Sequence, residues 1–159
     1  MKHSLTIGAD YSGSNTTIAI VSARFNGEIV EAMRVAAYET LLDNGVDKVN
    51  IKHVYVPGAF ELPLACKTLA ASKEYDAVIA LGCVIRGDTP HFNYVCSSSA
   101  QGIQQACLET NTPIAFGVLT TENSEQALER SSRSNMEHNK GRDMAFCALE
   151  MVNVLKSIS

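Results

Sequence analysis

The residue best suited to chemistry is His91, which closes the turn Arg86-Gly87-Asp88-Thr89-Pro90-His91. Histidine suits proton transfer because its unperturbed pKa lies close to neutral pH. His91 falls at a predicted helix start, so it is either a proton-transfer group or a residue that caps or packs there, and we favour the first. We interpret His3, His53 and His138 as structural, because they occur in a tail, along a strand and in a polar loop.

The turn before His91 is a candidate anion site. Gly87, Asp88 and Thr89 precede the predicted helix, where free backbone N–H groups and the helix dipole favour a phosphate. The Thr89 hydroxyl adds a donor, whereas the Asp88 carboxylate would repel an anion, so we expect only the Asp88 backbone to face it. The alternative is an ordinary turn with Asp88 or Thr89 as the N-cap. The turn is neither a P-loop nor a GxGxxG sequence, so it does not indicate ATP or NAD.

Other side chains near the predicted strand ends have two interpretations each. Phe25 either stacks on a planar heterocycle or covers the core. Glu61 either accepts hydrogen bonds from hydroxyl or amine groups or is simply favoured by a helix dipole. Arg130 and Lys140 are either solvated charges or groups that hold phosphate. Cys83 is interpreted as a lining or packing residue, because a nucleophilic thiol needs a lowered pKa.

Alternating strands and helices must position these residues. Four apolar, β-branched runs are each followed by a helical pattern, which indicates βαβ units and a parallel sheet. The predicted strands are residues 17–21, 51–56, 77–85 and 114–119, and the predicted helices are 29–41, 60–72, 92–109, 124–132 and 140–156, with the first ending at Asn44-Gly45. We expect an α/β fold, a flavodoxin-like three-layer sandwich with a four-stranded parallel sheet. Residues 1–159 form one domain in this interpretation, and the tail 1–15 is a candidate for an added strand on a neighbouring subunit.

Ligands of parallel sheets bind beyond the carboxyl ends of the strands. In this chain that rule selects four segments, which should lie along one rim of the sheet. They are residues 24–26, 57–61, 86–91 and 120–123.

Composition narrows the class of protein. A 46% hydrophobic and 19% charged chain is typical of a globular domain, and a net charge of -4 argues against a nucleic-acid partner. The five cysteines have no CxxC pair, which argues against a disulfide framework or zinc site and favours a reducing, cytoplasmic setting. Residues 1–15 do not resemble a signal peptide, and no apolar run approaches the ~20 residues of a membrane span.

Several long motifs occur in one order between Thr17 and Lys156. They are Ala23-Arg24-Phe25-Asn26, Val56-Pro57-Gly58-Ala59-Phe60-Glu61-Leu62-Pro63, Leu81-Gly82-Cys83-Val84-Ile85-Arg86-Gly87-Asp88-Thr89-Pro90-His91-Phe92, Phe116-Gly117-Val118-Leu119-Thr120-Thr121-Glu122-Asn123, Glu129-Arg130 and Asn139-Lys140-Gly141. This set resembles the 6,7-dimethyl-8-ribityllumazine synthase family. The resemblance implies a transferase of riboflavin biosynthesis without metal or organic cofactor. Such an enzyme condenses 5-amino-6-(D-ribitylamino)uracil with L-3,4-dihydroxy-2-butanone 4-phosphate and releases phosphate and water.

The resemblance also implies a role for each candidate residue. His91 would move protons, and Lys140 would assist near the phosphate or carbonyl. Phe116 would reach the site of a neighbouring subunit. The substrate-binding residues would be Phe25 on the pyrimidine ring, Ala59, Phe60, Glu61, Cys83, Val84 and Ile85 on the uracil and ribityl chain, and Gly87, Asp88, Thr89 and Arg130 on the phosphate.

Departures from the family pattern bear on assembly. Cys83 stands where the family often has Thr, and Asp88 replaces a small residue. The segment between Arg130 and Lys140 is longer than in typical bacterial members of the family. A lengthened segment at this place resembles that of members whose assemblies are smaller than a capsid, so we expect a homopentamer or a dimer of pentamers. Three alternatives stay open, namely a non-catalytic flavin- or lumazine-binding module, an archaeal-type riboflavin synthase and a purely structural shell protein.

Overall fold

A single parallel sheet forms the middle layer of the molecule. The computed structural model describes residues 4–159, and its strands are β1 (Ile18–Ala23), β2 (Ile51–Val56), β3 (Ala77–Ile85) and β4 (Ile114–Thr121). All neighbouring strands run parallel, in the order β2-β1-β3-β4. The predicted flavodoxin-like sheet of four parallel strands is therefore confirmed.

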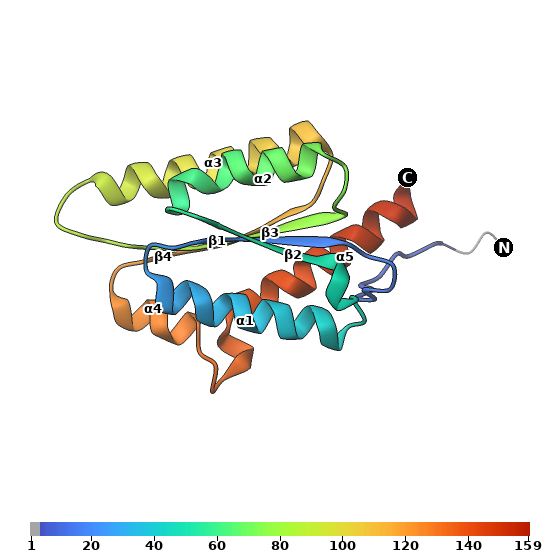
Figure 1. Cartoon of the computed structure of the whole chain (residues 1–159), viewed down its shortest axis with the longest axis horizontal. Helices are drawn as coiled ribbons and strands as arrows, with labels where there is room; N and C mark the ends of the chain where they lie inside the picture. The colour runs from blue at the N-terminus through green and yellow to red at the C-terminus, as the bar shows by residue number, and fades with distance from the viewer. Residues whose placement is uncertain (1–3) are drawn as a thin grey trace.

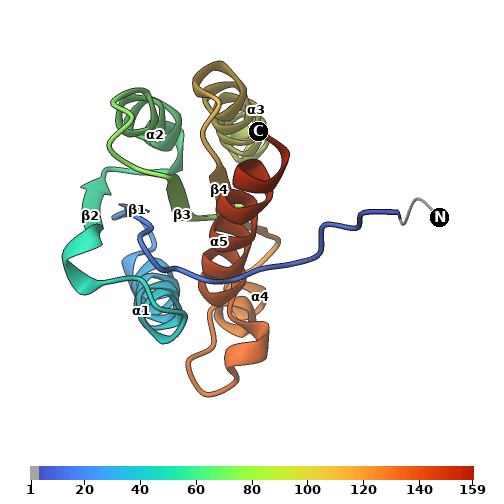
Figure 2. The same cartoon turned by 90° about the vertical axis from the view of Figure 1, so that its right-hand side faces the viewer.

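Helices cover both faces of this sheet. They are α1 (Gly27–Asp43), α2 (Leu62–Ala71), α3 (His91–Thr110), α4 (Ser124–Arg130) and α5 (Lys140–Ile158), with short 3-10 turns η1 (Lys48–Asn50), η2 (Ala59–Glu61) and η3 (Met136–His138). Helices α2 and α3 lie on one face, and α1, α4 and α5 lie on the other (Figures 1 and 2). All predicted strands and helices are present, with their ends shifted by one or two residues. The largest difference is at residues 59–61, which form η2 before α2 begins.

The central strands are buried because helices cover both of their faces. Every residue of β1 and the first seven residues of β3 are buried, as the apolar runs predicted. The predicted apolar face of α1 is also buried, and it consists of Ile29, Met33, Ala36, Ala37, Thr40 and Leu41. Gly45 follows α1 with φ 97°, the left-handed conformation expected of a glycine after a helix end. Core packing therefore holds the strands in place, and with them the residues that leave the carboxyl ends of the strands.

The segment before β1 crosses helix α5 (Figure 2). Residues 4–17 contain no helix or strand, and the Asn153 amide donates to the carbonyl oxygens of Asp10 and Ser12 at 2.8 and 3.0 Å. The Tyr11 ring packs edge-on against Phe146, with centroids 5.0 Å apart. The added strand on a neighbouring subunit stays a prediction. His3, interpreted above as structural, lies outside the described residues.

All five cysteines carry free thiols. Cys66 is fully buried, and burial raises the pKa of its thiol to about 12. A thiol of this kind behaves as a small apolar group. Among residues 4–159, each helix is too short or too polar to cross a lipid bilayer.

Candidate active site

The four strand exits lie at one end of the sheet, and three of them enclose a cavity (Figure 1). Its volume is about 720 Å³, which falls within the range of small-molecule sites. The fourth exit, residues 120–123, lies beside the third, because the Arg86 backbone N–H donates to the Thr121 carbonyl at 2.9 Å. The lining residues are Phe25, Pro57, Gly58, Ala59, Phe60, Glu61, Cys83, Val84, Ile85, Gly87, Thr89, His91, Phe92, Tyr94 and Val95.

Most of the predicted site residues meet in this cavity. The predicted residues that line it are Phe25, Ala59, Phe60, Glu61, Cys83, Val84, Ile85, Gly87, Thr89 and His91. Asp88, Phe116, Arg130 and Lys140 do not line it in this chain. The structure therefore brings the ring-binding and proton-transfer candidates together and leaves the candidate cations elsewhere.

Two exposed aromatic rings stand at the cavity. Phe25 is 71% exposed and Phe60 is 61% exposed, although both are large apolar side chains. Phe25 belongs to the turn between β1 and α1, and its backbone N–H donates to the Pro57 carbonyl at 3.0 Å. Rings that no core residue covers are suited to contact a planar ligand.

The turn η2 presents Glu61 to the cavity. The Glu61 N–H donates to the Gly58 carbonyl at 3.2 Å, and the buried Ser99 hydroxyl of α3 donates to the Ala59 carbonyl at 3.1 Å. A Cβ added at Gly58 would lie 3.3 Å from Glu61 Oε2, so glycine at this position leaves room for the carboxylate. Glu61 is thus an exposed acceptor at the rim, held by a turn that is anchored on α3.

The end of β3 forms the floor of the cavity through Cys83, Val84 and Ile85. The Cys83 side chain packs in the core between the sheet and helices α1 and α5. Burial raises the pKa of its thiol to about 11, so the thiolate is scarce at neutral pH. Cys83 thus lines the cavity while its thiol is buried in the core, a setting that does not favour a nucleophile.

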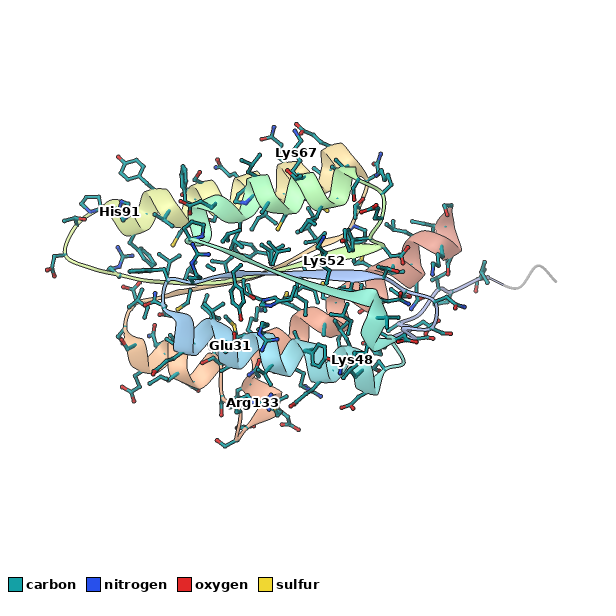
Figure 3. All side chains as sticks on the ribbon, viewed as in Figure 1. Glu31, Lys48, Lys52, Lys67, His91 and Arg133 are labelled. Carbon is teal, nitrogen blue, oxygen red and sulfur yellow. The ribbon has the colours of Figure 1, made fainter. Side chains whose placement is uncertain are left out.

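The turn between β3 and α3 leads directly to His91. Figure 3 shows His91 as the first residue of α3, at the end of the molecule where strands lead into helices. Pro90 is the N-cap residue and makes no side-chain cap bond, so neither Asp88 nor Thr89 occupies that position. The Thr89 hydroxyl is 3.4 Å from the His91 N–H, a weak contact. The helix start thus retains donors for an anion, and the exposed His91 imidazole lies beside them.

Arg86 anchors this turn. Its guanidinium Nε lies 2.6 Å from Glu122 Oε2, and the guanidinium Cζ lies 4.4 Å from the centre of the Phe92 ring. The hydrogen bond between Arg86 and Glu122 lowers the pKa of the Glu122 carboxyl and raises the pKa of the Arg86 guanidinium. This pair joins the third and fourth strand exits at the rim.

The remaining predicted residues lie on other elements. Phe116 is in the middle of the edge strand β4, opposite Ala80, and packs against the core under α2 and α3. Arg130 ends α4, and its Nη1 donates to the Gln126 carbonyl at 3.1 Å. Lys140 begins α5, where the buried Asn139 accepts from the Gly141 N–H at 2.8 Å and caps the helix. The segment between Arg130 and Lys140 therefore leads to a defined, capped helix start.

Sequence reasoning missed some of the lining. Tyr94 is 74% exposed and, with Phe92 and Val95, adds to the α3 wall of the cavity. For Tyr94 and Val95 the available signal was spacing, since residues three and four positions after His91 share its helix face. Within residues 4–159, no three His, Cys, Asp or Glu side chains gather as metal ligands. None of the described lining residues is Lys or Arg.

Comparison with known proteins identifies the family. The model of the family described as 6,7-dimethyl-8-ribityllumazine synthase matches residues 15–156. A protein of Paracidovorax citrulli (strain AAC00-1) named 6,7-dimethyl-8-ribityllumazine synthase is 51% identical over 147 residues, which cover 92% of each chain. The matched region contains every element that forms the cavity. The chain therefore belongs to the 6,7-dimethyl-8-ribityllumazine synthase family.

Proposed function

We propose that the protein condenses 5-amino-6-(D-ribitylamino)uracil with L-3,4-dihydroxy-2-butanone 4-phosphate to form 6,7-dimethyl-8-ribityllumazine. The observation that carries this proposal is the cavity itself, which joins exposed aromatic rings, an acceptor carboxylate and a helix start beside His91. Each feature fits one part of the two substrates, namely a flat ring, a polyhydroxyl chain and a phosphate. Membership of the family supplies the reaction.

The ring and chain of the aminouracil fit one side of the cavity. Phe25 stacks on the pyrimidine, and Phe60 of η2 lines the same cavity. Backbone groups of η2 and of Cys83 to Ile85 hydrogen-bond the uracil edge, and Glu61 accepts from the ribityl hydroxyls. The mostly apolar lining excludes water from the ring face, which strengthens these polar contacts.

The phosphate and the reacting atoms fit the other side. The backbone of residues 87–89 faces the phosphate, whose charge the α3 dipole stabilises. The aminouracil amine attacks the ketone carbonyl, and loss of water gives an imine. Loss of phosphate and closure of the second ring, with release of a second water, complete the lumazine. His91 donates and accepts the protons of these steps, and Lys140 assists near the phosphate or carbonyl.

Positioning contributes much of the rate. Two substrates held in register react as if at very high local concentration, equivalent to roughly 10⁵–10⁸ M in favourable cases. The imine and elimination steps need little besides proton transfer.

The site is completed by a neighbouring subunit in this proposal. The lining residues carry no cation, although a guanidinium is a good phosphate ligand, and Arg130, Lys140 and Phe116 lie away from the cavity of their own chain. A second copy at the rim supplies Phe116 and the phosphate-binding Arg130. The assembly is a pentamer or a dimer of pentamers in this proposal, because the segment between Arg130 and Lys140 resembles that of family members with smaller assemblies. Light scattering would contradict this if it found a megadalton shell or a monomer.

Mixing the protein with both substrates tests the reaction. We expect lumazine fluorescence and one phosphate released for each lumazine formed, and neither signal when the butanone phosphate is omitted. A pure binding module or shell protein gives no product. A riboflavin synthase instead consumes two lumazine molecules and forms riboflavin, a result that would overturn the proposal.

A further inference from the structure

Asn26 has an unusual backbone conformation directly beside the ring-binding Phe25. Its φ and ψ are 56° and 43°, in the left-handed region, and it is the N-cap residue of α1. Asparagine tolerates this conformation better than most residues, but it is rare outside glycine. The Asn26 side chain makes no cap bond to its own helix, so it is available for another contact.

That contact crosses to β3. The Asn26 amide Nδ2 donates to the Cys83 carbonyl at 2.9 Å, a bond between residues 57 positions apart. Strands β1 and β3 pair only as far as Ser22 and Leu81. Beyond that point the Asn26 amide continues the connection between the two strand ends.

The turn of residues 24–26 is therefore tied to both sides of the cavity. On the β2 side, the backbone N–H groups of Arg24 and Phe25 donate to the carbonyls of Val56 and Pro57 at 2.8 and 3.0 Å. On the β3 side, the Asn26 amide holds Cys83, whose neighbours Val84 and Ile85 form the floor. The exposed Phe25 ring is not fixed by core packing, so its position relative to the floor depends on these bonds.

We propose that Asn26 is a positioning residue that sets the distance between the Phe25 ring and the β3 floor through its bond to Cys83. This inference rests on the proposed function, because it assigns Asn26 to the aminouracil half of that site. The phosphate half is held by other bonds, those of Arg86 to Glu122 and Thr121. Loss of the Asn26 amide consequently weakens binding of the ring and leaves binding of the phosphate substrate unchanged.

Two substitutions separate the amide from the backbone conformation. Asn26→Gly keeps the left-handed turn without strain and removes only the amide. We expect the KM for the aminouracil to rise about fivefold, as for loss of one neutral hydrogen bond, with kcat and the KM for the butanone phosphate within about twofold of wild type. Asn26→Asp also tolerates the turn but sets a carboxylate against the Cys83 carbonyl, so we expect a larger rise.

Asn111 provides a matched control. It is an exposed asparagine with φ 51° at the end of α3, remote from the cavity lining. Asn111→Gly makes the same change of residue at the same kind of backbone position. Both KM values should remain those of wild type.

Binding of 6,7-dimethyl-8-ribityllumazine, measured by its fluorescence, tests the ring site without catalysis. We expect Asn26→Gly to bind it about fivefold more weakly than wild type or Asn111→Gly. Equal lumazine affinity in wild type and Asn26→Gly would overturn the inference, as would an equal rise of both KM values together with a lower melting temperature. A wild type that binds lumazine in this Asn26-dependent way but makes none would overturn the proposed function alone. A wild type that neither makes nor binds lumazine would overturn both.

Discussion

Gly141 allows helices α1 and α5 to approach closely, and its replacement should be costly. A Cβ added at Gly141 would overlap the Met33 carbonyl oxygen and lie 2.6 Å from the Met33 carbonyl carbon. Backbone atoms in the middle of α1 can give way only if the two helices separate. The Asn139 amide, which caps α5, also reaches the Ala32 carbonyl at 3.5 Å, so the whole start of α5 rests on α1.

The expected cost follows from two opposing effects. An extra methyl group in a packed contact costs about 1–3 kcal/mol, and a clash with backbone belongs at the upper end. Alanine recovers up to about 1 kcal/mol of helix propensity relative to glycine. We therefore expect Gly141→Ala to lower the free energy of unfolding by about 2 kcal/mol, which corresponds to a fall in melting temperature of roughly 4–8 °C.

Thermal denaturation followed by circular dichroism measures this change. Gly27→Ala is the matched control, because Gly27 begins α1 and a Cβ there would meet nothing within 4 Å. The control should melt within about 1 °C of wild type or slightly higher. A Gly141→Ala protein that melted with wild type would refute the close approach of the two helices.

Three further predictions concern the site and the pH dependence. His91→Ala should lower kcat by about tenfold to a hundredfold while leaving measurable turnover, because positioning remains; a folded variant without any activity would contradict this. Arg130→Ala should raise the KM for the butanone phosphate about tenfold or more, since it removes a charged hydrogen bond, and an unchanged KM would exclude Arg130 from phosphate binding. Burial, followed by the Arg34 charge, lowers the pKa of His53 from 6.5, so the unfolded chain binds more protons and stability should fall as the pH drops below about 6.5. His53→Gln should reduce that fall in denaturant titrations at pH 7.5 and 5.5, and an unchanged pH dependence would count against it.

The layered fold was predictable because local signals determine its elements. The apolar run at residues 77–85 is the central strand β3, and its residues have no exposed face that would require alternation. The face of α1 from Ile29 to Leu41 follows helical spacing, and Asn44-Gly45 ends it. Such patterns depend on neighbours within a few positions, so they can be found without the fold. The ends of α2 were less accurate, because 3-10 and α-helical turns have similar residue preferences.

The sequence by itself determined which residues leave the strands, and it thereby selected Phe25, Glu61, Thr89 and His91 for one rim. It could not determine which of those exits share a cavity. Residues 120–123 lie at the same rim but pair with Arg86 instead of lining the site, and Tyr94 joins the lining from one turn into α3.

Only the tertiary structure decided the contacts between distant residues. The bond from Asn26 to Cys83 and the approach of Gly141 to Met33 each join segments that are far apart in the chain. Their geometry depends on strand register and on how closely helices pack, quantities to which the whole core contributes. A local pattern states what a segment forms, whereas the distance between two segments is set by everything that packs between them.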